Sequence, residues 1–425
     1  MLRIRLWRRR VLFCSLFLVA AISGARENPD KLFVYLQEIF NRHNKNLHSF
    51  LLAELNQYIV NFPASEKTPE AQFLIAKVYQ EKGNKPQAVA AFLKTIYLYP
   101  GSNWQREAAS AARKMITEEG AFKEQRAKLL ALVEATPKGQ TPADRYFEYL
   151  LAVKGVEYAD AYGVVVDDAR KFLILFPEAT RQDTTIQMMA ELYAKNGEKH
   201  EAEACYLRLE YCCAESPLLP YARYSRGVLL SKELGEHKMA IDALNDLVSK
   251  SPTSEYATLA IFKMGEIKKE KLKDFGGAIA NYRRFVETST DSARTVDALW
   301  AIAEINTDNT KDYGNAIAAY TEIVEKHKGD KRAATAFEKI GDVFKDKLAD
   351  YNKAAEQYAK MIEAFPYNEK APALAIKAGD LCEDKLKDYQ RALEYYRLVI
   401  DKFPQSKIAD EARKKFEKAR VKAAK

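Results

Sequence analysis

The sequence has few of the residues that build metal sites and covalent catalytic centres. Its 425 residues include only five histidines and five cysteines. No histidines have the His-x-x-x-His spacing and no cysteines the Cys-x-x-Cys spacing, so we expect no bound metal. The sequence also lacks Gly-x-Gly-x-x-Gly, Walker and Gly-x-Ser-x-Gly motifs. These absences predict a protein that is not an enzyme, with no cofactor and no small-molecule substrate.

The cysteines also argue against a disulfide framework. Cys205 and Cys212 are seven residues apart, which on a helix separates them by about 10 Å. A disulfide needs Cα atoms within about 7 Å of each other. Glycine and proline are sparse as well, at 17 and 14 residues, and 48% of the chain is hydrophobic. This composition is expected to bury a core rather than to remain disordered.

No apolar run is as long as the roughly 20 residues that a membrane-spanning helix needs. The run over residues 11–22 has 12 residues, follows five arginines and precedes Ser23, Gly24 and Ala25. This layout is typical of a secretory signal peptide, with cleavage after Ala25, and an uncleaved anchor is the alternative. We therefore expect an exported protein, in the periplasm of a Gram-negative bacterium, with membrane association only through partners or an uncleaved signal.

The chain also lacks a large excess of one charge outside its ends. The formal net charge is +8, but the signal segment holds five arginines and no acid. The last 21 residues hold eight Lys or Arg against three acids. The body between these ends is close to neutral, so we expect no nucleic-acid partner. The basic end is expected to be a solvated cap; contact with acidic lipids or anionic polymers is the alternative.

What the sequence contains in abundance is repetition. Each of six acidic residues is followed by an alanine four positions later and by a Tyr or Leu eight positions later. Apolar residues four apart share one face of a helix. Phe365-Pro366 and Phe403-Pro404 end this helix in two units, because proline cannot continue the hydrogen-bond ladder. The acidic residues, which we expect to cap the helix, recur every 38 positions at Glu198, Glu236, Asp274, Asp312, Asp350 and Asp388.

A small residue marks a second helix in each unit. It stands 13 positions before each alanine from Ala240 onwards. A small residue inside a helical pattern predicts a close crossing by another helix. The two helices would form an antiparallel hairpin that cannot bury its own apolar face, so copies must stack. The small residues are Gly227, Gly265, Ala303, Gly341 and Gly379.

This pattern resembles the tetratricopeptide repeat family. The family's small residue, its Ala-x-x-x-aromatic motif and its closing proline match Gly379, Ala392 with Tyr396, and Pro404. The resemblance implies an all-α fold, a right-handed α-solenoid of about ten stacked antiparallel helix hairpins with a C-terminal capping helix. The motif Phe-Pro-x-Ser at residues 403–406 further resembles an envelope subgroup that includes outer-membrane assembly (BamD/ComL-like) and Tol-Pal accessory proteins.

The unit departs from the family in length, because the usual repeat has 34 residues and this one has 38. The extra residues fall mostly between the closing proline and the next small residue, with one more between the small residue and the alanine. The chain is expected to comprise a signal peptide (1–25), N-terminal hairpins (26–135), a Pro- and Gly-containing linker (136–142), the repeats (143–404) and a basic capping helix (405–425). In the cap, Ile408, Ala412, Phe416 and Ala419 are predicted to face inward.

The resemblance also implies where a partner would bind. In the family, the fifth and ninth positions of the first helix face the concave groove. Carried onto this chain, they form an aromatic strip beside an acidic strip, which suits a partner with apolar and basic side chains. The alternative is that the aromatics pack between helices and the acids face solvent. The predicted groove residues are Tyr224, Phe262, Trp300 and Glu338 at the fifth position, and Glu266, Glu304, Asp342 and Asp380 at the ninth.

The function expected from these observations is an exported, non-catalytic scaffold that binds other proteins or peptides on the concave face of the solenoid. One alternative is a structural subunit of a cell-envelope machine, and another is a peptidoglycan-associated accessory factor. Neighbouring acids such as Asp167 and Asp168 are expected to lie on solvated helices.

Overall fold

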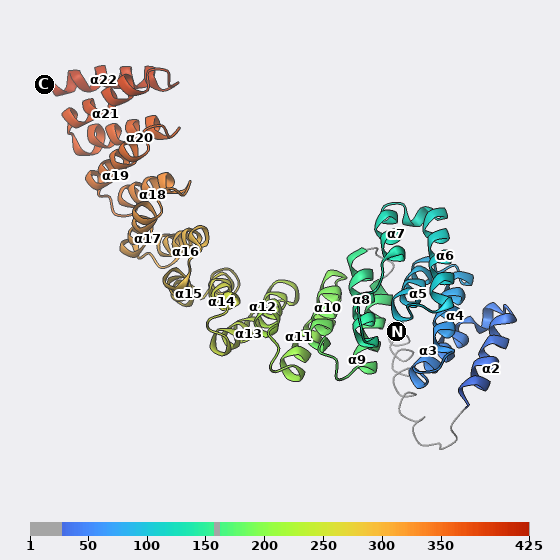
Figure 1. The fold of residues 1–425 in the computed structure, drawn as a ribbon. Coiled ribbons are helices and arrows are strands. Elements are labelled where there is room, and N and C mark those ends of the chain that lie inside the picture. The colour runs from blue at the N-terminus through green and yellow to red at the C-terminus, as the bar shows by residue number, and fades with distance from the viewer. Residues whose placement is uncertain (1–27, 157–161, 425) are drawn as a thin grey trace, which may run out of the picture. The chain divides into compact units, whose positions relative to one another are not determined.

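The computed structural model describes residues 28–156 and 162–424 (Figure 1). Every regular element within these ranges is helical, and no strand occurs among them. The chain divides into two compact units, with the boundary between Asn196 and Gly197. The predicted signal peptide lies outside the described residues. Among those described, no helix combines the length and the apolar character that crossing a membrane requires.

In the first unit, each helix packs against the next along the chain. The predicted linker, residues 136–142, follows α7 and ends at the first residue of α8. The apolar positions that continue the helical period in this part of the chain, such as Ala108, Ala112 and Leu129, are buried. The helices are α2 (Pro29–Asn41), α3 (His48–Asn61), α4 (Thr68–Glu81), α5 (Lys85–Leu98), α6 (Asn103–Glu118), α7 (Arg126–Glu134), α8 (Pro142–Val156), α9 (Tyr162–Leu175) and α10 (Gln182–Lys195).

Helix α5 is the centre of the first unit. Its ten residues 88–97 are all buried, because α4, α6 and α8 all pack against it. A helix that is apolar nearly all round is stable only when other elements surround it. The one charged side chain in that stretch, Lys94, therefore has to be accommodated inside the unit.

The second unit stacks consecutive helices in the same way, which confirms the predicted all-α fold of stacked hairpins (Figure 1). The first helix of each hairpin carries the small residue, and the second begins just after the acidic one. The helices are α11 (Lys199–Cys212), α12 (Leu219–Leu229), α13 (His237–Lys250), α14 (Glu255–Ile267), α15 (Phe275–Thr288), α16 (Ser292–Glu304), α17 (Tyr313–Lys326), α18 (Ala333–Asp346), α19 (Tyr351–Ala364), α20 (Ala371–Asp380), α21 (Tyr389–Lys402) and α22 (Ala409–Ala423).

The acidic residues cap the second helices as predicted where they are aspartates. The carboxylates of Asp274, Asp312, Asp350 and Asp388 each accept a hydrogen bond from the backbone N–H three residues on, at 2.9–3.1 Å. Glu198 and Glu236 hold the same position without a side-chain cap bond. The shorter carboxylate is thus the one that reaches the free N–H groups of the first turn.

The small residues mark close crossings, as the spacing predicts. A Cβ atom added to Gly341 would lie 2.4 Å from the ring of Tyr358, and one added to Gly379 would lie 2.5 Å from the ring of Tyr396. The aromatic residue of each second helix therefore lies directly on the backbone of the first helix. This contact explains why the small residue and the aromatic recur together.

Wide π-helical turns follow four of the small residues and accommodate the extra residue after them. They are η5 (Leu230–Leu234), η6 (Lys268–Leu272), η7 (Ile305–Asn309) and η8 (Leu381–Leu386). A π turn takes up one more residue than an α turn, because its hydrogen bonds span five positions. In every unit the residue before the acidic cap then adopts a left-handed conformation, with φ between 52° and 76°, at Gly235, Lys273, Lys311, Ala349 and Lys387.

Helix α22 closes the stack, as predicted. Ala412 and Ala419 are buried against the last hairpin, and Ile408 and Phe416 pack beside them. Its lysines lie on the exposed side or pair with acids of the last hairpin, such as Lys415 with Asp380 of α20 at 2.8 Å. A polar outer face of this kind keeps the end of a stack of hairpins soluble.

Candidate partner-binding surface

The eight predicted groove residues lie on the first helices of successive hairpins in the second unit. Tyr224, Phe262, Trp300 and Glu338 lie on α12, α14, α16 and α18. Glu266, Glu304 and Asp342 follow the last three of them by one helical turn, and Asp380 holds the same position on α20, so the two rows run side by side. All eight side chains are half-buried. We call these eight residues the groove rows.

Phe262 and Trp300 pack against their own hairpins, and Tyr224 packs against Tyr256 of the next one. The ring of Phe262 lies 5.5 Å from that of Tyr282 and 5.0 Å from that of Phe285, both edge-on. The ring of Trp300 lies 5.2 Å from that of Tyr320. Each aromatic thus contributes to packing on one side and keeps part of its surface exposed, the state that suits an anchor for a partner.

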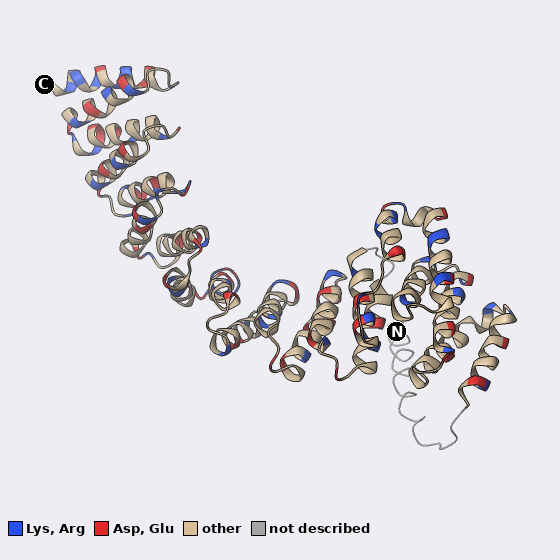
Figure 2. Ribbon diagram, viewed as in Figure 1, with Lys and Arg blue, Asp and Glu red and all other residues tan. Residues whose placement is uncertain are grey.

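The acidic members of the groove rows are paired with lysines. Glu304 meets Lys269 at 3.0 Å across one repeat, and Glu338 meets Lys370 at 2.8 Å and Lys377 at 3.4 Å. Glu266, Asp342 and Asp380 also lie within 4.0 Å of lysine ammonium groups. The strip is therefore a ladder of alternating charge rather than an acidic surface, and Figure 2 shows both signs interspersed along these helices.

Glu304 joins the aromatic row to the charged row. Its Oε1 accepts a hydrogen bond from the indole Nε1–H of Trp300 at 2.8 Å, while its other oxygen faces Lys269. In the next hairpin, burial acts to raise the pKa of Glu338, but the hydrogen bonds and charges of its two lysines outweigh burial and hold that pKa below its ordinary value. Glu338 is therefore charged and held in place at neutral pH.

The pairing lysines were missed by the sequence analysis, although a signal for them was present. Lys269 precedes Glu304 by 35 residues, and Lys415 follows Asp380 by 35. A separation near the repeat length places two side chains on adjacent layers of a stack. Inspection of lysines at that distance from each acid would have predicted the ladder.

Two segments of the chain match the family model for the tetratricopeptide repeat, residues 70–102 and residues 377–406. The first covers α4 and α5, and the second covers the end of α20 and all of α21. Each unit therefore contains one segment that matches the tetratricopeptide repeat. No curated protein matches the sequence.

Several solved structures resemble the chain. A tetratricopeptide repeat protein from Parabacteroides merdae is 15% identical over 64% of this chain and 99% of its own, with a TM-score of 0.35. The C-terminal part of a repeat protein from Cytophaga hutchinsonii is 21% identical over 55% of this chain and 92% of its own, with a TM-score of 0.34. PilW, described as a type IV pilus biogenesis factor, is 15% identical over 56% and 99%, with a TM-score of 0.33.

A buried ion pair that no motif indicated joins the first matched repeat to α9. Lys94 on α5 and Asp168 on α9 are 7% and 5% exposed, and their charged atoms lie 2.8 Å apart. Lys94 also donates to the hydroxyl of Tyr146 at 2.7 Å, and the hydroxyl of Tyr149 donates to Asp168 at 2.8 Å. The expectation that Asp168 faces solvent is wrong, because α9 turns this residue toward α5; its neighbour Asp167 is the exposed acid.

The buried pair titrates away from its ordinary range. Burial lowers the pKa of Lys94 from 10.5 to about 8, against the attraction of Asp168. Burial acts in the opposite direction on Asp168, but the charges of Lys94 and Lys171 outweigh it and hold its pKa below the usual value. The pair and its tyrosine partner join α5, α8 and α9, so we assign it a structural role.

Lys94 is expected to make stability rise with pH in the alkaline range. Between about pH 8 and 10.5 the folded chain has released the Lys94 proton that the unfolded chain still holds. The free energy of unfolding should therefore gain up to about 1.4 kcal/mol per pH unit from this residue. Urea unfolding of wild type and Lys94→Met across this range measures it: the variant should lack the contribution, and equal slopes would contradict the assignment.

Metal binding receives no support from the structure. Among the described residues, no group of three or more His, Cys, Asp or Glu side chains has the geometry to hold an ion.

Proposed function

We propose that this chain is an exported, non-catalytic scaffold that binds partner polypeptides along the groove rows. The observation that carries the proposal is the recurrence, on successive layers, of a half-exposed aromatic beside an acid that is held by lysine. Large aromatics give contact area with little loss of conformational freedom. Charged pairs beside the aromatics would fix the orientation and register of a bound partner segment.

The ladder of alternating charge restricts which side chains a partner segment can present to the groove rows. A surface of uniformly negative charge would select a basic segment, whereas this one presents acids and lysines in turn. The fitting partner is an extended or helical segment with apolar anchors and side chains of both signs. Such a segment would exchange ion pairs with the ladder, so its binding should weaken as salt screens exposed charges.

A matched pair of variants tests the groove. Trp300→Ala removes the central aromatic, and Tyr367→Ala removes a tyrosine that is 99% exposed on a turn outside the groove rows. With each variant immobilised and exposed to extract from the protein's own cells, we expect Trp300→Ala to retain about tenfold less partner polypeptide than wild type or Tyr367→Ala.

The stability of the same two variants shows whether Trp300 acts as a groove residue or as a core residue. Trp300 is half-buried, so its truncation should lower the free energy of unfolding by no more than about 1–2 kcal/mol, less than the 3–5 kcal/mol of a buried aromatic. If Trp300→Ala loses several kcal/mol, or if both variants capture the same polypeptides equally, the groove assignment fails.

Export forms part of the proposal and rests on the sequence of residues 1–25. Its test is the mass of the protein recovered from its own cells: cleavage after Ala25 yields a chain that begins at Arg26. A full-length chain in the cytoplasmic fraction would contradict it.

Membership of an envelope machine is the finer alternative, supported by the Phe-Pro-x-Ser motif at residues 403–406. A scaffold of this kind should bind an isolated partner segment, whereas a structural subunit should co-purify with a large membrane complex. Sedimentation with cell-wall sacculi would instead indicate a peptidoglycan-associated factor.

A further inference from the structure

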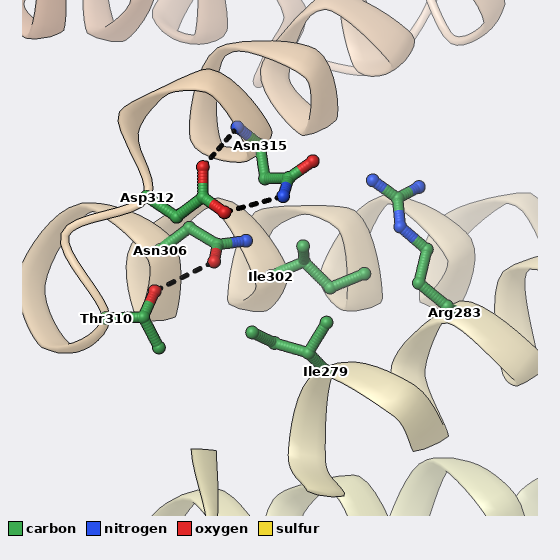
Figure 3. Close-up of a pocket in the computed structure, with 7 residues that line it drawn as sticks. All are labelled: Ile279, Arg283, Ile302, Asn306, Thr310, Asp312 and Asn315. Carbon is green, nitrogen blue, oxygen red and sulfur yellow. Dashed lines mark hydrogen bonds between the residues drawn. The ribbon is translucent and has the colours of Figure 1, made fainter. Parts of the chain in front are cut away.

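A pocket of about 300 Å³ lies between two consecutive hairpins of the second unit. It lies between the second helices α15 and α17, at the turn that ends α16 (Figure 3). Ile302 lines it and comes two residues after Trp300 on α16, so the two side chains point to opposite sides of that helix. The pocket is therefore separate from the groove rows.

The pocket exists because this repeat departs from the others at two positions. Where the other repeats have Leu230, Lys268, Phe344 or Cys382, this one has Asn306. Where they have a leucine before the left-handed residue, this one has Thr310. Both replacements substitute a small polar side chain for a larger or apolar one. Stacking does not need them, since the other repeats stack without them.

Asn306 brings an unused hydrogen-bond donor into the pocket. It is 3% exposed, and its Oδ1 accepts from the hydroxyl of Thr310 at 2.9 Å. Its Nδ2 has no partner among the described residues, and Figure 3 shows this nitrogen pointing toward the centre of the lining residues. This nitrogen is accessible from the pocket and is available to a ligand oxygen.

The two ends of the pocket carry opposite charges (Figure 3). At one end stands Arg283, whose Nη1 donates to Glu322 at 2.8 Å while its remaining N–H donors have no partner among the described residues. At the other end stands Asp312, which accepts from the backbone N–H and the side-chain Nδ2 of Asn315. The Oδ1 atom of Asn315 is left as a free acceptor there. Ile279 and Ile302 supply the apolar wall between the ends.

We propose that this pocket binds a small zwitterion, an α-amino acid with an aliphatic side chain. Its carboxylate would accept from the Nδ2 of Asn306 and from the guanidinium group of Arg283. Its ammonium group would face Asp312 and the Oδ1 of Asn315. Its side chain would lie against Ile279 and Ile302. The volume is sufficient for one residue, and neither charge of the ligand would be left unpaired.

The test is a calorimetric titration of the full chain with L-leucine, isocaproate and isoamylamine. The last two carry the leucine side chain with the carboxylate alone or the amine alone. L-leucine should bind saturably at millimolar concentration, and both analogues should bind at least about tenfold more weakly. No saturable binding of L-leucine, or equal binding of either analogue, would overturn the proposal.

A variant that restores the other repeats' residues supplies the control for folding. Asn306→Leu with Thr310→Leu places leucines where Leu230 and Leu272 stand in earlier repeats, so it should fold at least as stably as wild type. L-leucine binding should fall by about tenfold or more in this variant and should persist in Trp300→Ala. Unchanged binding in the double variant would overturn the assignment. Because the pocket and the groove are on opposite sides of α16, either can fail without the other.

Discussion

Replacing Asp168 by alanine is expected to lower the free energy of unfolding of the first unit by about 3–5 kcal/mol. The substitution leaves the Lys94 ammonium group buried on α5 without its partner 2.8 Å away. Removing one partner of a buried ion pair lowers the free energy of unfolding by more than the pair's net contribution to it, because an uncompensated charge remains. Lys94 would respond by losing its proton, so the loss should grow as the pH is lowered. Urea unfolding, with hydrogen exchange of α5, α8 and α9, measures it.

The adjacent acid provides the matched control. The side chain of Asp167 is 67% exposed and pairs with Arg170 at 3.3 Å, so Asp167→Ala should change stability by less than about 1 kcal/mol. Joint replacement, Lys94→Met with Asp168→Leu, should recover most of the loss, because apolar side chains of similar volume often replace buried pairs without harm. Equal losses for Asp167→Ala and Asp168→Ala would show that the pair is not buried in solution.

Gly341→Ala is expected to destabilise the second unit by about 1–3 kcal/mol, although alanine is the better helix former. The added Cβ would lie 2.4 Å from the Tyr358 ring. That ring is fully buried and donates its hydroxyl to Asp342 at 2.6 Å, so it cannot move aside without breaking a hydrogen bond. Overpacking of a well-filled contact typically has this magnitude. Thermal unfolding, followed by helical circular dichroism, measures it.

A second glycine in a helix serves as a control, because it separates the effect of the close contact with the Tyr358 ring from the effect of replacing glycine by alanine in a helix. Gly276 lies in the first turn of α15, and a Cβ built there would meet nothing within 4 Å. Gly276→Ala should leave stability unchanged or raise it by up to about 1 kcal/mol, because alanine loses less backbone entropy. If both substitutions have the same effect, the close crossing is not what selects glycine at position 341.

The repeat was predictable because stacking imposes a strict period. Successive layers place an acid before the second helix, a small residue at the crossing and a large apolar side chain over it, so these recur 38 apart. The structure confirms the capping role of the four aspartates and the close crossings at the glycines. The one extra residue after the small position was also located from the sequence. The π turns that contain it were not, since a single insertion does not say whether a helix widens or a loop lengthens.

The groove rows are an intermediate case. Family geometry predicts on which face Phe262 and Trp300 lie, and both are half-buried in the structure. Their chemistry was only partly predicted, because the acids were identified without their lysines. An ion pair between layers joins residues 32–39 positions apart, and a local pattern search does not examine that distance.

The sequence by itself determined the period, the helices, their caps and their close crossings, since each of these follows from contacts within one hairpin or between copies of it. Only the tertiary structure decided which individual residues are buried, paired or placed at a pocket. Asp168 looked like a solvated acid until α9 brought it against Lys94. No motif pointed to Asn306 and Thr310, which the structure places in the lining of the pocket between α15 and α17. Burial and charge pairing depend on neighbours that a repeat does not specify, so they emerge only when the layers are assembled.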